Sequence, residues 1–249
     1  MKIKTPIPRF WPGAARRAVP LAFAAAATLV LLATACGSSD SGSGSDVLFQ
    51  AEDGLVIHGR VFGNGAPGVV LSHMLNGDQG DWTTFAETLA VRGFSVLTFD
   101  FRGHGKSGGG KEVGIADTDM SAALRFMRVR LNRPNVFLIG ASMGGTAALK
   151  VASREEVLGV VSLSAPVSIR GLSALLDVER VASAKLFVAA EGDGKAASDA
   201  QRLFDLAGDP KQLEIVGGGR HGTDLLKGGD ADRVRGLILD FLEQYRVGL

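Results

Sequence analysis

The chain has 249 residues, of which 46% are hydrophobic, and this composition is typical of a globular protein rather than a disordered one. Its 27 basic and 26 acidic residues leave a formal net charge of +1, with no basic tail or clustered stripe. This balance excludes the electrostatic footprint of a nucleic-acid-binding protein, so no nucleic-acid partner is expected. The lone cysteine, Cys36, excludes an intramolecular disulfide and argues against a cysteine-rich zinc site.

The first 35 residues have the pattern of an export signal. Residues 1–17 carry five basic side chains and no acid, residues 19–35 are almost all apolar or small, and small residues lead directly into Cys36. This order predicts a signal peptide over residues 1–35. The segment ending Ala33-Thr34-Ala35-Cys36 resembles the lipobox of bacterial lipoproteins, although Ala33 stands where leucine is usual.

That resemblance implies cleavage before Cys36 and attachment of lipid to it, which would anchor the exported protein to the outer face of the bacterial cell membrane. A secreted protein with an ordinary signal peptide and an uncleaved membrane anchor are the alternatives. Residues 36–45 are rich in glycine and serine and are predicted to form a flexible tether. The folded domain is expected over residues 46–249.

Strand-like and helix-like segments alternate along this domain. The predicted strands are residues 47–52, 56–62, 68–72, 94–101, 135–139, 157–163, 185–189 and 213–216. The predicted helices are residues 81–92, 117–131, 143–153, 196–207 and 231–245. The first two strands form a hairpin, and the repeated βα units after them predict an α/β fold with a mostly parallel sheet flanked by helices. Residues 166–180 hold only a short helical segment, so the cap is expected to be minimal.

The motif Gly-x-Ser-x-Gly occurs at residues 140–144, between the predicted strand 135–139 and the predicted helix 143–153. This strand–turn–helix context is the one that a nucleophile elbow requires, and it makes Ser142 the candidate nucleophile. The glycines are needed because side chains two positions from the serine would collide in so tight a turn. The amino end of the following helix points its N–H groups at the serine and favours an oxyanion there.

On these residues the chain resembles the α/β-hydrolase superfamily, in particular its compact dienelactone hydrolase-like and small serine esterase members. The resemblance extends over residues 46–249 and implies a triad in the order serine, acid, histidine. His221, in the glycine-rich loop after the last predicted strand, is the expected base. Asp193, in the loop after strand 185–189, matches the family's acid. Glu191 is its competitor, and Asp199 is disfavoured because it falls within the next helix.

Two backbone donors are expected to form the oxyanion hole. One is the N–H of Met143, directly after the nucleophile. The resemblance places the other in His73-Met74-Leu75, where family members often have His-Gly-x and x supplies the N–H. This alignment assigns Leu75. Met74 replaces the usual glycine, and it remains the alternative donor.

The other histidines are expected to have structural roles. His73 is predicted to brace the loop that carries Leu75. The segment at residues 100–107 resembles the family sequence D-x-R-G-H-G-x-S, and in it Arg102 and His104 are predicted to form structural hydrogen bonds. His58 lies in the first hairpin, where a surface or packing role is expected.

The predicted function is a serine hydrolase that cleaves carboxylic ester-like bonds of a small-molecule ester or acyl substrate. No cofactor and no metal are expected, because acyl transfer to water through the triad needs neither. A thioesterase, a peptidase and a cofactor-free perhydrolase use the same fold and triad and stay open as alternatives. An alternative of another class is a non-catalytic envelope binding protein that keeps the hydrolase fold.

Overall fold

The computed structural model describes residues 44–246 of the chain. The predicted signal peptide, Cys36 and the tether up to residue 43 lie outside the described residues. Ser45, predicted to belong to the tether, is the first residue of strand β1 (Ser45–Gln50), so the folded domain begins one residue earlier than predicted.

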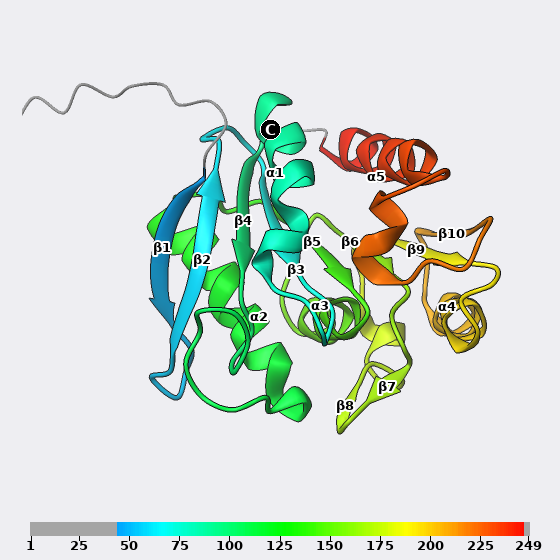
Figure 1. Ribbon diagram of the computed structural model, residues 1–249, viewed down its shortest axis with the longest axis horizontal. Coiled ribbons are helices and arrows are strands. Elements are labelled where there is room, and N and C mark those ends of the chain that lie inside the picture. Colours follow the sequence, from blue (N-terminus) through cyan, green and yellow to red (C-terminus); the bar gives the residue numbers. More distant parts are fainter. Residues whose placement is uncertain (1–43, 247–249) are drawn as a thin grey trace, which may run out of the picture. The chain divides into compact units, whose positions relative to one another are not determined.

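The domain is built on one eight-stranded sheet with the spatial order β1-β2-β4-β3-β5-β6-β9-β10 (Figure 1). Its remaining strands are β2 (Val56–Phe62), β3 (Gly68–Ser72), β4 (Ser95–Phe99), β5 (Val136–Ala141), β6 (Gly159–Leu163), β9 (Ala184–Ala190) and β10 (Lys211–Val216). The pairs β1–β2 and β2–β4 are antiparallel, and every other neighbouring pair is parallel. The predicted hairpin and the mostly parallel sheet are therefore confirmed.

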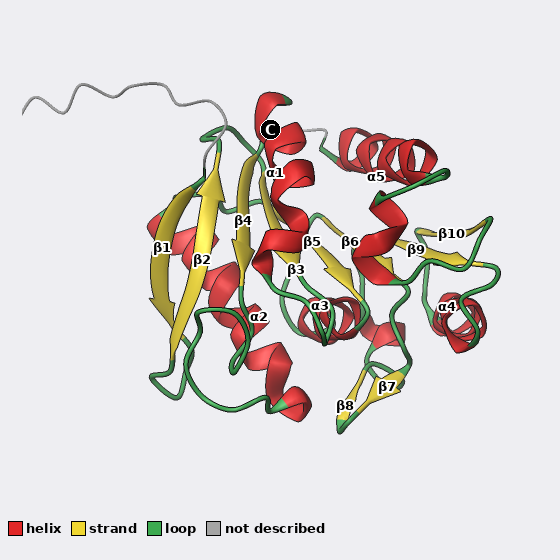
Figure 2. Cartoon of the chain, viewed as in Figure 1, coloured by secondary structure: helices red, strands yellow, loops and turns green. Residues whose placement is uncertain are grey.

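Within residues 44–246, five α-helices cover both faces of the sheet (Figure 2). They are α1 (Thr83–Val91), α2 (Ala116–Arg125), α3 (Met143–Ala152), α4 (Lys195–Leu206) and α5 (Ala231–Tyr245). The central strands are buried along their whole length, as expected of parallel strands that are covered on both sides.

Alternation along the strands divides the apolar side chains between two cores. In β3, Val70 packs with side chains from α2, α3 and α4 in one core. Val69 and Leu71 point the other way and pack with side chains from α1 and α5. The period of two along the strand thus fixes which helices lie on which face.

Three predicted segments differ from the structure in the kind of element they form, whereas the ends of the others shift by at most two residues. The helix predicted at 81–92 begins as a 3-10 turn, Gln79–Trp82, capped by the side chain of Asp78. The helix predicted at 117–131 is α2 followed by a π-helical turn, Phe126–Arg130. Residues 166–180 contain a two-stranded hairpin, β7 (Ser168–Ile169) and β8 (Leu172–Ser173), and one 3-10 turn, rather than a short helical segment alone.

All the parallel strands end at one edge of the sheet, and the loops that follow them meet there. The loops after β3, β5, β9 and β10 carry the predicted site residues. In open α/β sheets this carboxyl edge is where ligands bind. Within residues 44–246, none of the helices is long and apolar enough to cross a membrane.

Candidate active site

Ser142 joins β5 directly to α3 in a strained backbone conformation. Its φ is 50° and its ψ is −116°, a region that non-glycine residues rarely occupy. The N–H of Ser142 donates to the carbonyl of Leu163 at the end of the neighbouring strand β6, with an N···O distance of 2.7 Å. This bond and the two flanking elements hold the turn in place.

The two motif glycines have no room for a side chain. A Cβ on Gly144 would lie 2.6 Å from the carbonyl oxygen of Ser72 and 2.9 Å from that of His73. A Cβ on Gly140 would lie 2.3 Å from the backbone of Gly144. The steric reason given for the motif is therefore confirmed, and the turn is pressed against the end of β3.

The amino end of α3 leaves donors free beside Ser142. Helix α3 begins at Met143, and the side chain of Ser142 does not cap it. Within the described residues, the N–H of Met143 has no hydrogen-bond partner. Such a donor, reinforced by the positive end of a ten-residue helix, can stabilise an oxyanion.

His221 and Asp193 are brought together from the loops after two neighbouring strands, β10 and β9. The Nδ1 of His221 lies 2.8 Å from Oδ2 and 3.1 Å from Oδ1 of Asp193. With Nδ1–H donating to the carboxylate, the Nε2 of the neutral ring is left as the acceptor. Glu191 makes no such contact, since it is exposed at the start of the loop.

Close backbone contact couples these two loops. The N–H of Gly192 donates to the carbonyl oxygen of Gly218 at 2.7 Å. A Cβ on Gly192 would come within 2.8 Å of that oxygen, so glycine is required there. Asp199 lies in α4, as predicted, where its carboxylate accepts from Lys195 and from the backbone N–H of Val167.

The loop that carries His221 lies against the neighbours of Ser142 and Leu75. The position of a Cβ on Gly222 is 3.4 Å from the Cβ of Ala141 and 3.1 Å from the Sδ of Met74. No hydrogen bond joins His221 to Ser142 within the described residues, and the side chain of His221 is 43% exposed. Catalytic hydrogen bonds are often long before substrate binds, so the missing hydrogen bond does not argue against His221 as the base for Ser142.

Two buried histidines brace the loop after β3. The Nδ1 of His73 lies 2.7 Å from the carbonyl oxygen of Met74, and its Nε2 accepts from the N–H of Phe101 at 3.0 Å. Burial lowers the pKa of His73 to about 4, so the ring is neutral and donates from Nδ1. The Nε2 of His104 lies 2.9 Å from the carbonyl oxygen of Leu75. The structural roles predicted for both histidines are confirmed.

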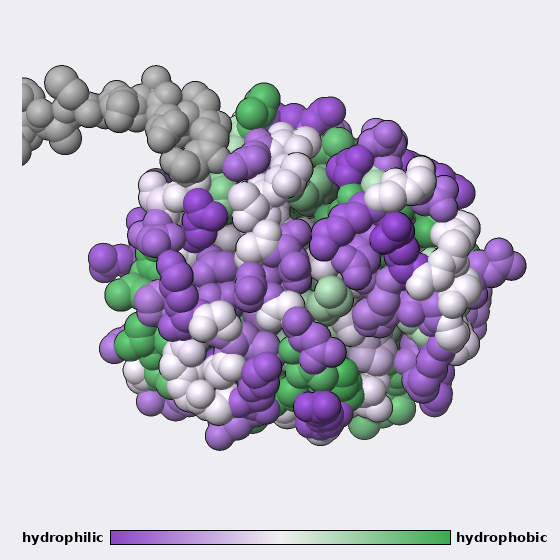
Figure 3. Space-filling model, viewed as in Figure 1, coloured by the Kyte–Doolittle hydropathy of each residue, from purple (hydrophilic) through white to green (hydrophobic). Residues whose placement is uncertain are grey.

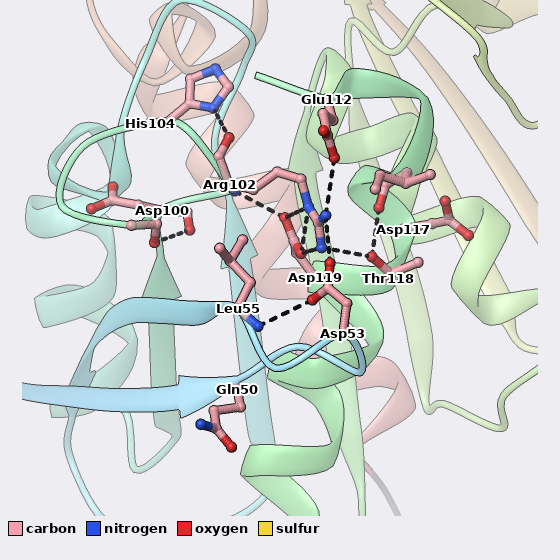
Figure 4. Close-up of polar contacts among 12 residues, drawn as sticks. Gln50, Asp53, Leu55, Asp100, Arg102, His104, Glu112, Asp117, Thr118 and Asp119 are labelled. Atoms are coloured by element: carbon pink, nitrogen blue, oxygen red, sulfur yellow. Dashed lines mark hydrogen bonds and ion pairs between the residues drawn. The ribbon is translucent and has the colours of Figure 1, made fainter. Parts of the chain in front are cut away.

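Arg102 is the centre of an ion-pair network beside this loop (Figure 4). Its guanidinium contacts the fully buried carboxylate of Asp119 at 2.7 Å, and those of Asp53 and Glu112 at 2.9 and 3.3 Å. These hydrogen bonds raise the pKa of Arg102. The sequence predicted a structural Arg102 but missed its partners, because they lie in three separate segments. The acid of the same motif, Asp100, accepts from the backbone and side chain of Gln79.

No group of three or more histidine, cysteine, aspartate or glutamate side chains within residues 44–246 is arranged to hold a metal ion. The chemistry that this edge of the sheet can perform with its own residues is proton transfer and nucleophilic attack. Its groups for these steps are a hydroxyl at a strained turn, an imidazole–carboxylate pair, and free backbone donors.

Comparison with known proteins supports the same family. The family model described as the alpha/beta hydrolase fold matches residues 64–192. An uncharacterised protein of Mycobacterium tuberculosis is 30% identical over 213 residues, which cover 75% of each chain. The uncharacterised protein YfhR of Escherichia coli is 28% identical over 236 residues, which cover 82% of each.

Solved structures show the same fold at lower identity. An esterase of Pyrococcus furiosus has a TM-score of 0.74 and 19% identity, and the match covers 83% of this chain and 94% of that one. A monoacylglycerol lipase of Paleococcus ferrophilus has a TM-score of 0.67 and 19% identity, with 76% and 99% covered. The sheet order, the elbow and the family model agree, and the chain belongs to the α/β-hydrolase family.

Proposed function

We propose that this protein is a serine hydrolase that cleaves carboxylic ester-like bonds through Ser142, His221 and Asp193. The observation that carries the proposal is the contact between His221 Nδ1 and the Asp193 carboxylate, in a loop that lies against the residue preceding Ser142. A carboxylate in this position keeps Nε2 free as a base and stabilises the imidazolium that forms when it takes a proton. The esterase and lipase among the structural neighbours are consistent with this chemistry.

In the proposed reaction, Ser142 Oγ attacks the ester carbonyl carbon while His221 Nε2 takes the hydroxyl proton. The tetrahedral intermediate collapses as the C–O bond to the alcohol breaks, and His221 returns its proton to the departing alkoxide. Water then attacks the acyl-enzyme, giving one proton to His221, and the acid leaves as Ser142 regains that proton. Each proton moves through His221, so the reaction balances without a cofactor.

Met143 and Leu75 supply the oxyanion donors in this proposal, and backbone geometry favours Leu75 over Met74. The oxygen and hydrogen of a trans peptide point in opposite directions. The carbonyl of Met74 points at the buried ring of His73, so the N–H of Leu75 points away from that ring. The carbonyl of His73 faces Gly144, so the N–H of Met74 points away from the elbow.

Kinetics on a panel of nitrophenyl esters test the proposal. The variants Ser142→Ala and His221→Ala are expected to lose at least about 10³-fold in kcat, and Asp193→Asn about 10³–10⁴-fold. The matched controls Glu191→Gln and His58→Ala are expected to retain wild-type rates. A folded wild-type protein that hydrolyses none of the esters would favour the non-catalytic alternative. Because the described residues 166–180 contain only the short β7–β8 hairpin and one 3-10 turn, short acyl chains are expected to react best, and a strong preference for long chains would contradict that part.

We further propose that the protein is exported and that Cys36 becomes its lipid-carrying amino terminus. The support is the order of basic, apolar and small residues before Cys36, together with the Gly/Ser-rich segment that separates Cys36 from β1. We expect the chain to float with lipid vesicles and the Cys36→Ala variant to lose this attachment, as measured by vesicle flotation.

A further inference from the structure

An open groove of about 390 Å³ lies between the edge strand β1 and the end of α2. Leu48 and Phe49 line it from β1, and Phe126 and Val129 line it from the π-helical turn after α2. The rings of Phe49 and Phe126 stack with centroids 5.1 Å apart, which gives the groove an apolar base. The groove lies far along the sheet from the candidate active site.

Two of the most exposed large apolar side chains of the described domain flank this groove. Leu48 is 60% exposed and Val129 is 71% exposed. Hydrophobic residues gather along the flank where β1 lies, at the left of Figure 3. Scattered apolar residues are normal on a protein surface, but a pair that borders one apolar groove indicates an interaction site.

Two arginines also line the groove, Arg125 and Arg130. The guanidinium of Arg125 donates to the backbone oxygen of Gln50 at 3.2 Å. Within residues 44–246 neither arginine forms an ion pair with a carboxylate, whereas the nearby Arg128 is paired with Glu155. The groove therefore carries a local positive charge although the net charge of the whole chain is close to zero. We expect a partner for the groove to carry anionic groups beside apolar ones.

The chain reaches this flank directly from the proposed lipid-carrying residue. Eight residues, Gly37 to Gly44, separate Cys36 from β1, and Leu48 follows four residues after Gly44. Eight residues can span at most about 28 Å, whatever conformation they adopt. A lipid on Cys36 would thus keep β1 close to the membrane surface at all times.

We infer that this flank, made of Leu48, Val129, Arg125 and Arg130, docks on the anionic lipid surface to which Cys36 anchors the chain. The inference rests on the lipid attachment proposed above. The two apolar side chains enter the headgroup region, and the two guanidinium groups contact lipid phosphates. Three features point to the same occupant: the apolar base of the groove, its two arginines, which have no carboxylate partner within residues 44–246, and the short connection to Cys36.

Docking in this way holds the candidate active site off the bilayer. Three strands, β2, β4 and β3, separate β1 from β5, which carries Ser142 at its end. At about 4.8 Å per strand, Ser142 lies about 19 Å from the docked edge.

Fluorescent reporters on the full, lipid-anchored chain in vesicles test the inference. A dye is placed on Val129→Cys, or on Leu176→Cys as the matched control, since Leu176 is 79% exposed and does not line the groove. With phosphatidylcholine vesicles containing phosphatidylglycerol, quenching by spin-labelled lipids is expected at position 129 and not at 176. Arg125→Glu with Arg130→Glu, or vesicles of phosphatidylcholine alone, are expected to abolish the quenching while the chain still floats with the vesicles.

Other outcomes would overturn the inference. These are equal quenching at both positions, or quenching at 129 that survives the double arginine replacement. A signal at 129 that appears without vesicles and rises with protein concentration would assign the flank to a second copy of the chain. The wild-type chain could hydrolyse soluble esters and yet float with neither kind of vesicle, or the Cys36→Ala variant could float as well as wild type. Either result would refute the anchored docking without contradicting the proposed hydrolase activity.

Discussion

At the scale of single residues, the candidate site depends on a tight backbone turn around Ser142 that leaves no room for side chains on the neighbouring glycines. Ser142 has a φ of 50°, Gly144 lies against the carbonyl groups at the end of β3, and Gly140 lies against the backbone of Gly144. Strain of this kind persists only where the surroundings enforce it, and it is concentrated at functional sites. Ser142 is therefore positioned by its neighbours' lack of side chains as much as by any hydrogen bond.

Replacing Gly144 by alanine tests this positioning. The new Cβ would lie 2.6 Å from the carbonyl oxygen of Ser72, so the free energy of unfolding is expected to fall by about 1–3 kcal/mol. Ester hydrolysis should fall with it, because the turn that presents Ser142 must shift. Urea denaturation and steady-state kinetics measure the two effects.

Gly236→Ala is the matched control. Gly236 lies inside α5, and a Cβ there meets nothing within 4 Å. Removing a glycine from a helix interior is expected to raise the free energy of unfolding by about 0.5–1 kcal/mol, with activity unchanged. A Gly144→Ala protein as stable and as active as wild type would show that the turn tolerates a side chain and would remove the steric argument.

At the scale of elements, the sequence predicted β2, β3 and α5 with their observed bounds, because each is a strand-like or helix-like segment bounded by turn residues, and β3 is a continuous apolar run. A single helix was predicted over residues 117–131, because the apolar pattern continues across the π-helical turn at Phe126–Arg130. The sequence missed β7 and β8, because strands of two residues have no period to detect. The loops of His221 and Asp193 were placed correctly, since both follow predicted strands at one edge of the sheet.

What the sequence could not supply at this scale is the pairing between distant segments. Arg102 takes its buried partner from α2, in Asp119, and exposed partners from two other loops. These contacts have sequence separations of 10 to 49 residues, and they depend on how the loops fold back on one another.

Asp119→Asn is expected to destabilise the domain by about 3 kcal/mol, because it leaves the buried guanidinium of Arg102 without its closest counter-charge. Glu112→Gln removes an exposed partner of the same arginine and is expected to cost under about 1 kcal/mol. Thermal or urea unfolding of the two variants compares them directly. If both variants lost the same free energy of unfolding, the burial of Asp119 would not determine the strength of its ion pair with Arg102.

At the scale of the whole molecule, stability is expected to fall in mild acid because of His73. Burial lowers the pKa of its ring to about 4, from an ordinary value of 6.5. Between these values the unfolded chain binds a proton that the folded protein does not, so the free energy of unfolding decreases as the pH falls from 6.5 to 4. The full contribution is present above pH 6.5 and amounts to about 3 kcal/mol.

The pH dependence of urea unfolding measures this effect in wild type and in His73→Asn. Asparagine can keep a neutral donor near the carbonyl of Met74 but cannot take up the proton, so the variant should lose about 3 kcal/mol less than wild type over the same interval. The comparison uses the slope with pH, so a uniform loss of stability in the variant does not affect it. Parallel curves for the two proteins would contradict a neutral, buried His73.

The central claim is that the folded domain activates Ser142 as a nucleophile through the imidazole that Asp193 orients. A fluorophosphonate probe, followed by mass spectrometry of the labelled peptides, tests it most directly. The predicted result is a single adduct on Ser142, absent in Ser142→Ala and strongly reduced in His221→Ala. A folded wild-type protein that stays unlabelled, or an adduct on any other serine, would contradict the account.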